Sequence, residues 1–275
     1  MEPRLQRRVQ RYGWDLAASE YEALWQAQLA PAQAGLLASA SLAAGERVLD
    51  VACGTGLVSL QAARAVGAQG RILGVDLSGQ MVDAAARRAS DSGLSNVDFA
   101  RMDGEALAVP EGCFDAALCA FGLMYMPEPG QALREMHRVL RPGGRLGLAV
   151  WGERARCGWS AVFPIVDAEV ASEVCPLFFR LGQADVLARL CEGAGFQAVT
   201  QHRITATLAY TGGDQACDAA FVGGPVALAW ARFDEGVRER VRARYLEAIA
   251  PWQEEDPDGR GYRVPAEFVL VSAIR

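Results

Sequence analysis

The sequence predicts an α/β fold with a doubly wound, mostly parallel sheet. Residues 45–151 alternate short apolar runs with helical patterns, which is typical of parallel sheets flanked by helices. The first apolar run leads directly into a turn that contains Gly54 and Gly56, and the next run ends at Asp76. Because the carboxyl ends of parallel strands meet at one edge of a sheet, these groups are expected to share one binding edge.

The chain divides into three segments of one domain (1–275) without a clear linker. Residues 14–44 predict a helical lead-in, since their large apolar side chains are spaced for one helix face. Residues 45–151 hold the alternation described above. Residues 152–275 complete the sheet with a strand at about 198–209 and a final strand over 268–274, which we expect to be antiparallel.

Composition excludes several classes of protein. The 275 residues are 51% hydrophobic, but no apolar run is long enough to span a membrane and no signal peptide is evident. The net charge of −6 argues against a nucleic-acid surface, although Arg4, Arg7, Arg8 and Arg11 predict a short solvated basic helix face. Seven cysteines without a C-x-x-C pair indicate reduced thiols, a cytoplasmic location and no metal site.

The glycine turn and the acid after the second strand indicate an adenosine-containing cofactor. Glycines let the backbone approach a ligand closely, and Asp76 can accept both hydroxyls of a ribose. Dinucleotide-binding proteins share this arrangement, with Ser59 here at the third small position. However, Asp50 within the strand would repel a pyrophosphate and attract an ammonium or a sulfonium. A third interpretation is that the glycines serve only a tight turn.

The spacing D-x-x-x-G-x-G from Asp50 to Gly56, followed by a strand ending in Asp76, resembles the class I S-adenosylmethionine-dependent methyltransferases. Residues 97–107 resemble the family's third strand, with Asp103 as the acid after it. A helix followed by Arg141-Pro142-Gly143-Gly144 and a strand resembles the small-molecule branch that includes the ubiquinone/menaquinone-biosynthesis methyltransferases. The resemblance covers about residues 45–151.

This resemblance implies a Rossmann-like, seven-stranded sheet with an antiparallel last strand, and S-adenosyl-L-methionine as the cofactor. In the family's pattern Asp76 meets the ribose, Asp103 meets the adenine amino group, and the main chain at Gly104 meets a ring nitrogen. The residues expected at the cofactor are Tyr21, Trp25, Asp50, Ala52, Gly54, Gly56, Asp76, Leu77, Met81, Asp103, Gly104 and Cys119. Tyr125, just after the fourth strand, is the candidate catalytic residue; it either bonds a substrate hydroxyl or only walls the pocket.

Two C-terminal insertions are expected to form a mobile lid over this edge. One spans Cys157–Gly182, and the other lies between the last two strands, with Gly212-Gly213 and Gly223-Gly224 as candidate hinges. The predicted aromatic roof consists of Trp159, Phe163, Pro164, Ile165, Val166, Phe178 and Phe179. Alternatively, these residues only pack the added helices onto the sheet.

The sequence therefore predicts an S-adenosylmethionine-dependent methyltransferase whose partner is a small, apolar or aromatic acceptor. A non-catalytic S-adenosylmethionine-binding protein and a nicotinamide-dependent oxidoreductase remain alternatives. The oligomeric state stays open, with a homodimer as one alternative.

Overall fold

The computed structural model describes residues 2–170, 178–256 and 259–275. The strands are β1 (Arg47–Val51), β2 (Arg71–Asp76), β3 (Val97–Arg101), β4 (Phe114–Ala120), β5 (Leu140–Trp151), β6 (Gln197–Tyr210), β7 (Gln253–Asp256) and β8 (Gly259–Ile274). The α-helices are α1 (Pro3–Ala17), α2 (Tyr21–Ala40), α3 (Leu57–Val66), α4 (Gly79–Asp91), α5 (Pro129–Val139), α6 (Val162–Asp167), α7 (Val186–Gly193), α8 (Gly213–Phe221), α9 (Ala227–Trp230) and α10 (Glu235–Ile249). Short 3-10 turns cover Leu123–Tyr125, Arg154–Arg156, Gly158–Ala161 and Ala250–Trp252.

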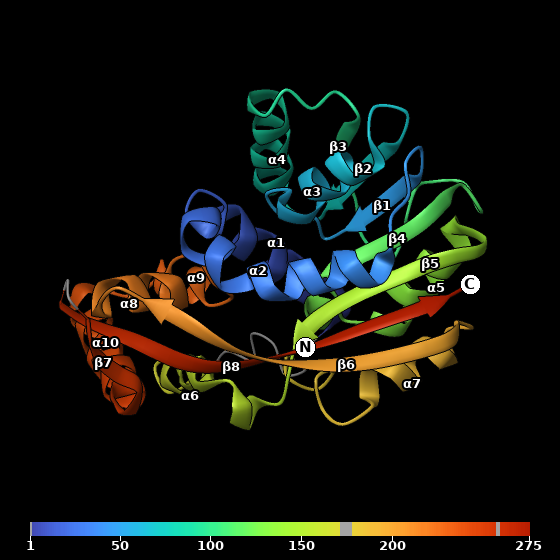
Figure 1. Ribbon diagram of the computed structural model, residues 1–275. Coiled ribbons are helices and arrows are strands. Elements are labelled where there is room, and N and C mark those ends of the chain that lie inside the picture. Colours follow the sequence, from blue (N-terminus) through green and yellow to red (C-terminus); the bar gives the residue numbers. More distant parts are fainter. Residues whose placement is uncertain (1, 171–177, 257–258) are drawn as a thin grey trace.

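The sheet has the order β3-β2-β1-β4-β5-β8-β6, and β7 pairs with β8 beside this path (Figure 1). Strands β1 to β5 are parallel, with Leu49 opposite Leu73 on β2 and opposite Ala117 on β4. Val48, Leu49 and Val51 are fully buried, as expected for a parallel strand covered by helices on both faces. The doubly wound sheet predicted from the sequence is confirmed.

The last strand is antiparallel, as predicted. β8 pairs antiparallel with β5 over residues 268–274 on one side and with β6 over residues 262–274 on the other. β7 is an additional short strand that the sequence analysis did not predict; it forms a hairpin with the start of β8.

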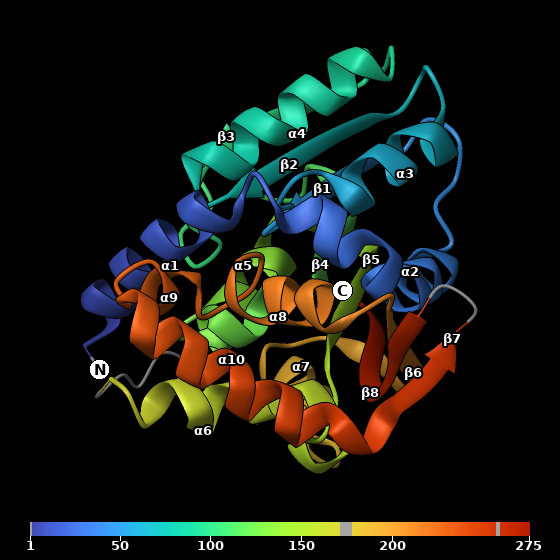
Figure 2. The same cartoon turned by 90° about the vertical axis from the view of Figure 1, so that its left-hand side faces the viewer.

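The helical lead-in is longer than predicted and consists of two helices. α1 begins at Pro3, a residue suited to the first helical position because its missing N–H has no helical partner there. A turn at residues 18–20 separates this helix from α2, which begins at Tyr21. Figure 2 shows α1 beside α9, and the C-terminal part of α1 also contacts the start of α4 through Asp15.

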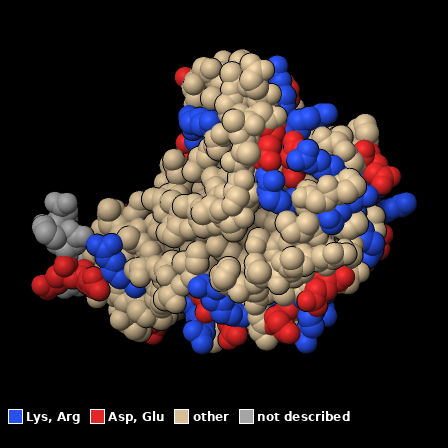
Figure 3. Space-filling view, turned by 45° about the vertical axis from the view of Figure 1, so that its right-hand side comes forward, with Lys and Arg blue, Asp and Glu red and all other residues tan. Residues whose placement is uncertain are grey.

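The helices added after β6 pack together at one end of the molecule. α10 contacts α6 and α8, and these helices gather beyond the carboxyl end of β6 (Figures 1 and 2). Among the described helices, none has both the length and the apolar character needed to cross a membrane. On the face in Figure 3, arginines and acidic side chains lie intermixed.

Candidate functional site

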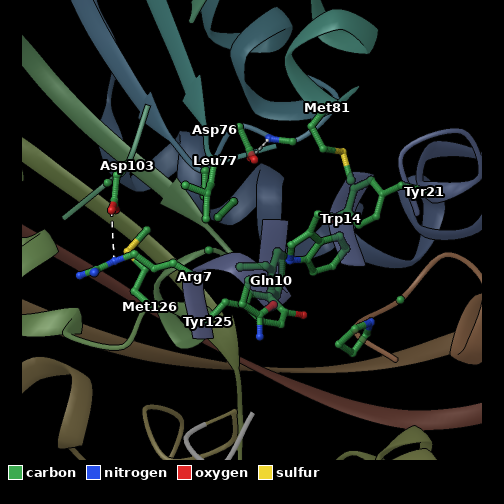
Figure 4. A pocket seen from close by; sticks show the side chains of 18 of the residues that line it. Arg7, Gln10, Trp14, Tyr21, Asp76, Leu77, Met81, Asp103, Tyr125 and Met126 are labelled. Carbon is green, nitrogen blue, oxygen red and sulfur yellow. Dashed lines mark hydrogen bonds and ion pairs between the residues drawn. The ribbon is translucent and has the colours of Figure 1, made fainter. Parts of the chain in front are cut away.

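A pocket lies at the carboxyl ends of β1, β2 and β4, beneath α1 and α2. It encloses about 960 Å³, part of it open to solvent. The loops after these strands supply its floor, and side chains from α1 and α2 cover it (Figure 4). The pocket therefore occupies the edge at which doubly wound sheets bind ligands.

Two strained turns shape the floor of this pocket. Ala52 follows β1 with a φ of 56°, and Phe121 follows β4 with a φ of 60°. Left-handed backbone at a residue other than glycine costs about 1–3 kcal/mol and persists only where the surroundings enforce it. A Cβ on Gly122 would lie 2.2 Å from the Cβ of Ala52, so the two loops touch at this point. Strain of this kind clusters at functional sites.

The two glycines of the turn after β1 have different roles. Both have positive φ, 55° at Gly54 and 83° at Gly56. Gly54 lines the pocket, and a Cβ there would meet only a ring carbon of Tyr21, at 4.0 Å. A Cβ on Gly56 would instead lie 3.2 Å from Ala85 and 3.3 Å from Phe99, and Gly56 does not line the pocket. Gly54 thus leaves open space on the pocket side, whereas Gly56 lets the start of α3 pack closely against Ala85 of α4 and Phe99 of β3.

Asp76 organises the same turn. Its two carboxylate oxygens accept the backbone N–H groups of Gly54 and Ser78, each at 2.9 Å. Burial raises the pKa of this carboxyl. Each oxygen retains a second lone pair, and Asp76 lines the pocket, so the carboxylate can also accept hydroxyl groups from a ligand. The expected ribose contact fits this geometry and stays a prediction.

Asp50 lies behind the pocket wall rather than in it. Its side chain is 1% exposed, and one oxygen accepts the hydroxyl of Ser59 at 2.5 Å. The other oxygen has no hydrogen-bond partner among the described residues. Burial raises the pKa of Asp50 to about 7, and the nearby charge of Asp76 adds to this effect. Asp50 is therefore a buried residue that does not contact the pocket directly.

An ion pair from α1 closes the end of the pocket next to β3. The Nε of Arg7 lies 3.1 Å from a carboxylate oxygen of Asp103, and the same guanidinium pairs with the buried Glu105 (Figure 4). The other oxygen of Asp103 accepts the backbone N–H of Glu105 at 2.9 Å. The prediction that Arg7 belongs to a solvated basic face is therefore wrong. The spacing of residues within α1 cannot indicate that Arg7 pairs with Asp103 and Glu105, which lie almost one hundred residues further along the chain.

Much of the remaining lining is aromatic. The ring of Tyr125, which lies near Arg7 in Figure 4, is 5.1 Å from Trp14 and 5.2 Å from Phe178, in edge-to-face contacts. The rings of Trp25, Trp151 and Trp159 also contact one another. Of the described residues that line the pocket, those with charged side chains are Arg7, Asp76, Asp103 and Glu105. The pocket thus has a polar end and an apolar end.

The predicted aromatic roof is largely a second layer. Trp159 lines the pocket, but Phe163 and Phe179 do not; they pack against Trp159 with ring centroids 5.5 and 6.0 Å away. Pro164, Ile165, Val166 and Phe178 do not line the pocket either. The roof prediction is therefore wrong for every member except Trp159, because the three phenylalanine rings pack against its indole instead. Residues 171–177 of this predicted lid, including Cys175, lie outside the described residues.

The predicted hinge at Gly223-Gly224 is a packing contact. A Cβ on Gly223 would lie 2.7 Å from a methyl of Leu24, so the glycine lets this segment press against α2. Gly224 lines the pocket together with Pro225.

Most of the residues predicted at the site line one pocket. They are Tyr21, Trp25, Ala52, Gly54, Asp76, Leu77, Met81, Asp103, Gly104 and Tyr125. Asp50, Gly56 and the fully buried Cys119 do not line it. The lining residues that the sequence analysis did not place at the cofactor include Arg7, Gln10, Trp14, Glu105 and Trp151.

Comparisons with known proteins agree with this geometry. Residues 48–144 match the family described as a methyltransferase domain. The chain is 33% identical over 176 residues to a ubiquinone/menaquinone biosynthesis C-methyltransferase of Azotobacter vinelandii, covering 58% of this chain and 70% of that protein. It is 36% identical over 119 residues to a demethylmenaquinone methyltransferase of Listeria monocytogenes, covering 43% of this chain and half of that protein.

A solved putative methyltransferase of Bacillus halodurans shares the fold. The two structures superpose with a TM-score of 0.62 at 20% identity, over 88% of this chain and 97% of the other. With the glycine turn, the acid after β2 and the sheet order in place, the chain belongs to the class I S-adenosylmethionine-dependent methyltransferases.

Proposed function

We propose that this methyltransferase transfers a methyl group to a small, uncharged acceptor with an aromatic or quinone-type ring. The observation that carries the proposal is the division of the pocket. Its charged lining residues come from α1 and from the ends of β2 and β3, whereas Trp25, Trp151 and Trp159 form a separate cluster of indole rings. An apolar, aromatic wall favours burial of an uncharged ring. The relatives named for quinone biosynthesis support the same class of acceptor.

The polar end suits the cofactor. Asp76 would accept the ribose hydroxyls, Gly54 would let the backbone approach the methionine part, and Asp103 would meet the adenine amino group. Leu77 and Met81 supply apolar walls beside them. When bound, S-adenosylmethionine supplies an activated methyl group on a sulfonium.

The remaining task of the protein is alignment. Trp14 and Phe178 hold the ring of Tyr125 at the boundary between the two ends of the pocket. There its hydroxyl would orient a polar atom of the acceptor, while the indoles of Trp151 and Trp159 exclude water. Alignment of this kind can lower a barrier by about 7–11 kcal/mol.

A screen for S-adenosylhomocysteine release tests the proposal. Purified protein with S-adenosylmethionine is incubated with reduced quinones, phenols, and charged amines or carboxylates of similar size. Turnover confined to uncharged ring acceptors is the expected result. Turnover only with charged acceptors would refute the acceptor class. Cofactor binding without release for any ring acceptor would favour a non-catalytic binding protein.

Tyr125→Phe separates orientation from packing. The variant keeps the ring contacts to Trp14 and Phe178 but loses the hydroxyl. We expect kcat for the best acceptor to fall about tenfold or more, with unchanged affinity for the cofactor. Unchanged kcat would leave Tyr125 as a wall of the pocket.

A further inference from the structure

The outer face of α1, defined by Leu5, Tyr12 and Leu16, is an exposed apolar stripe. These large side chains are 40%, 48% and 50% exposed, and all three lie on this one helix. At 100° per residue they fall within about 40° of one another around the helix axis. Scattered apolar side chains on a surface are ordinary, but a contiguous stripe marks an interaction surface.

The helix departs from the pattern of an ordinary surface helix. Its inward side carries Gln6 and Gln10, which are only 7% and 6% exposed, and Arg7, which pairs with Asp103 and Glu105. The inward side of α1 therefore mixes these polar groups with Trp14 and Ala17, and the large apolar side chains Leu5, Tyr12 and Leu16 lie outside. An amphipathic helix normally turns its apolar stripe toward the core.

Positive charge flanks the stripe. Arg4, Arg8 and Arg11 follow one side of it, at helical positions next to Leu5 and Tyr12. Among the described residues Arg4 and Arg8 have no ion-pair partner, and the guanidinium of Arg11 lies 4.5 Å from the ring centroid of Tyr12. The whole chain carries a net charge of −6, so this basic flank is local.

Asp15, an acid on the same helix, is engaged elsewhere. Its carboxylate accepts the hydroxyl of Ser78 at 2.6 Å, which ties the end of α1 to the start of α4. Among the described residues, neither Asp15 nor Glu2 at the N-cap forms an ion pair with Arg4 or Arg8, so these arginines keep their charge available to an external partner.

We propose that the outer face of α1 docks on the interface of an anionic lipid bilayer. A surface helix with an apolar stripe and arginines beside it lies in the plane of the interface, with the apolar side chains below the headgroups and the cations at the lipid phosphates. Charge complementarity selects anionic over neutral lipid.

Docking in this way would place the helix that covers the pocket at the bilayer. Arg7, Gln10 and Trp14, on the inward side of the same helix, line the pocket (Figure 4). The bilayer would therefore contact the outer side of this cover. The inference goes beyond the proposed methyl transfer and does not depend on it, since lipid binding is measured without cofactor or acceptor.

Vesicle co-sedimentation of the full chain tests the proposal. The probes are vesicles of phosphatidylcholine alone and of phosphatidylcholine with about one-third phosphatidylglycerol. We expect binding to the anionic vesicles only. Since each arginine near an anionic surface contributes about fivefold, the triple variant R4Q/R8Q/R11Q should bind on the order of 100-fold more weakly. The variant L5S/Y12S/L16S should also lose binding.

A matched control variant removes three positive charges from surfaces other than α1. R87Q/R154Q/R180Q removes three exposed arginines that lie outside α1 and should bind vesicles like the unaltered protein. Circular dichroism and thermal unfolding establish that each variant is folded. Equal binding by all three triple variants, or equal binding to neutral vesicles, would overturn the proposal. Sedimentation velocity showing a dimer that Leu16→Ser dissociates would assign the stripe to a second copy of the chain and overturn it likewise.

Discussion

Replacing Asp50 by Asn should remove a pH-dependent loss of stability. Asp50 is 1% exposed, with one oxygen bonded to Ser59 and the other without a partner among the described residues. Burial raises its pKa to about 7. Because the folded-state pKa lies above the ordinary value, the folded protein binds a proton here more tightly than the unfolded chain does.

The sign and size of the effect follow from that difference. The stabilising contribution of protonated Asp50 is fully present below about pH 4 and is lost as the pH rises through about 7. The complete loss amounts to about 4 kcal/mol in the free energy of unfolding. Asp50→Asn keeps an acceptor for Ser59 but cannot ionise. Its unfolding free energy should therefore not show this decline.

Urea denaturation at pH 5 and pH 8 measures the effect. The readout is the difference in unfolding free energy between the two pH values for each protein. Any destabilisation by the new amide in Asp50→Asn that does not depend on pH cancels in this difference. Ser59→Ala is a second variant. The hydrogen bond from Ser59 lowers the pKa of Asp50, so its removal should raise this pKa and extend the decline in stability to higher pH. Parallel pH profiles for Asp50→Asn and the unaltered protein would refute the reasoning.

Two further predictions concern the turn after β1 and the α1 ion pair. Gly56→Ala should lower the unfolding free energy by about 1–3 kcal/mol, because the new methyl group crowds a packed site. Gly54→Ala should chiefly weaken S-adenosylmethionine binding, as measured by calorimetry. If the two variants lost the same affinity and had the same stability, the assigned roles would be contradicted. Arg7→Gln should cost about 1–3 kcal/mol, because it leaves the buried Glu105 without its cation, and should speed amide exchange in α1. Exposed Arg8→Gln is the control and should change stability by less than about 0.5 kcal/mol; the same cost for both variants would be inconsistent with the ion pair.

The sheet could be predicted because its signals are local. Most of the parallel strands contain a short apolar run, and Gly54 and Asp76 mark the strand ends by their positions alone. Parallel pairing then brings those ends to one edge, so most of the predicted residues line one pocket.

The cover of the pocket could not be predicted in the same way. The partners of Arg7 come from the loop after β3, and the choice between Trp159 and Phe163 as the pocket wall depends on side-chain packing. Neither leaves a periodic pattern in the sequence. The same limit explains the different roles of Gly54 and Gly56, which depend on whether Phe99 or open space lies beside each glycine.

We infer that the edge formed by Gly54 and Asp76 binds S-adenosylmethionine. Calorimetric titration of the cofactor into the unaltered protein, Asp76→Ala and the exposed control Asp98→Ala tests it most directly. Loss of charge-assisted hydrogen bonds, each contributing about 1.5–3 kcal/mol, should weaken binding to Asp76→Ala more than tenfold and leave Asp98→Ala unchanged. Equal affinity for all three folded proteins would contradict the claim.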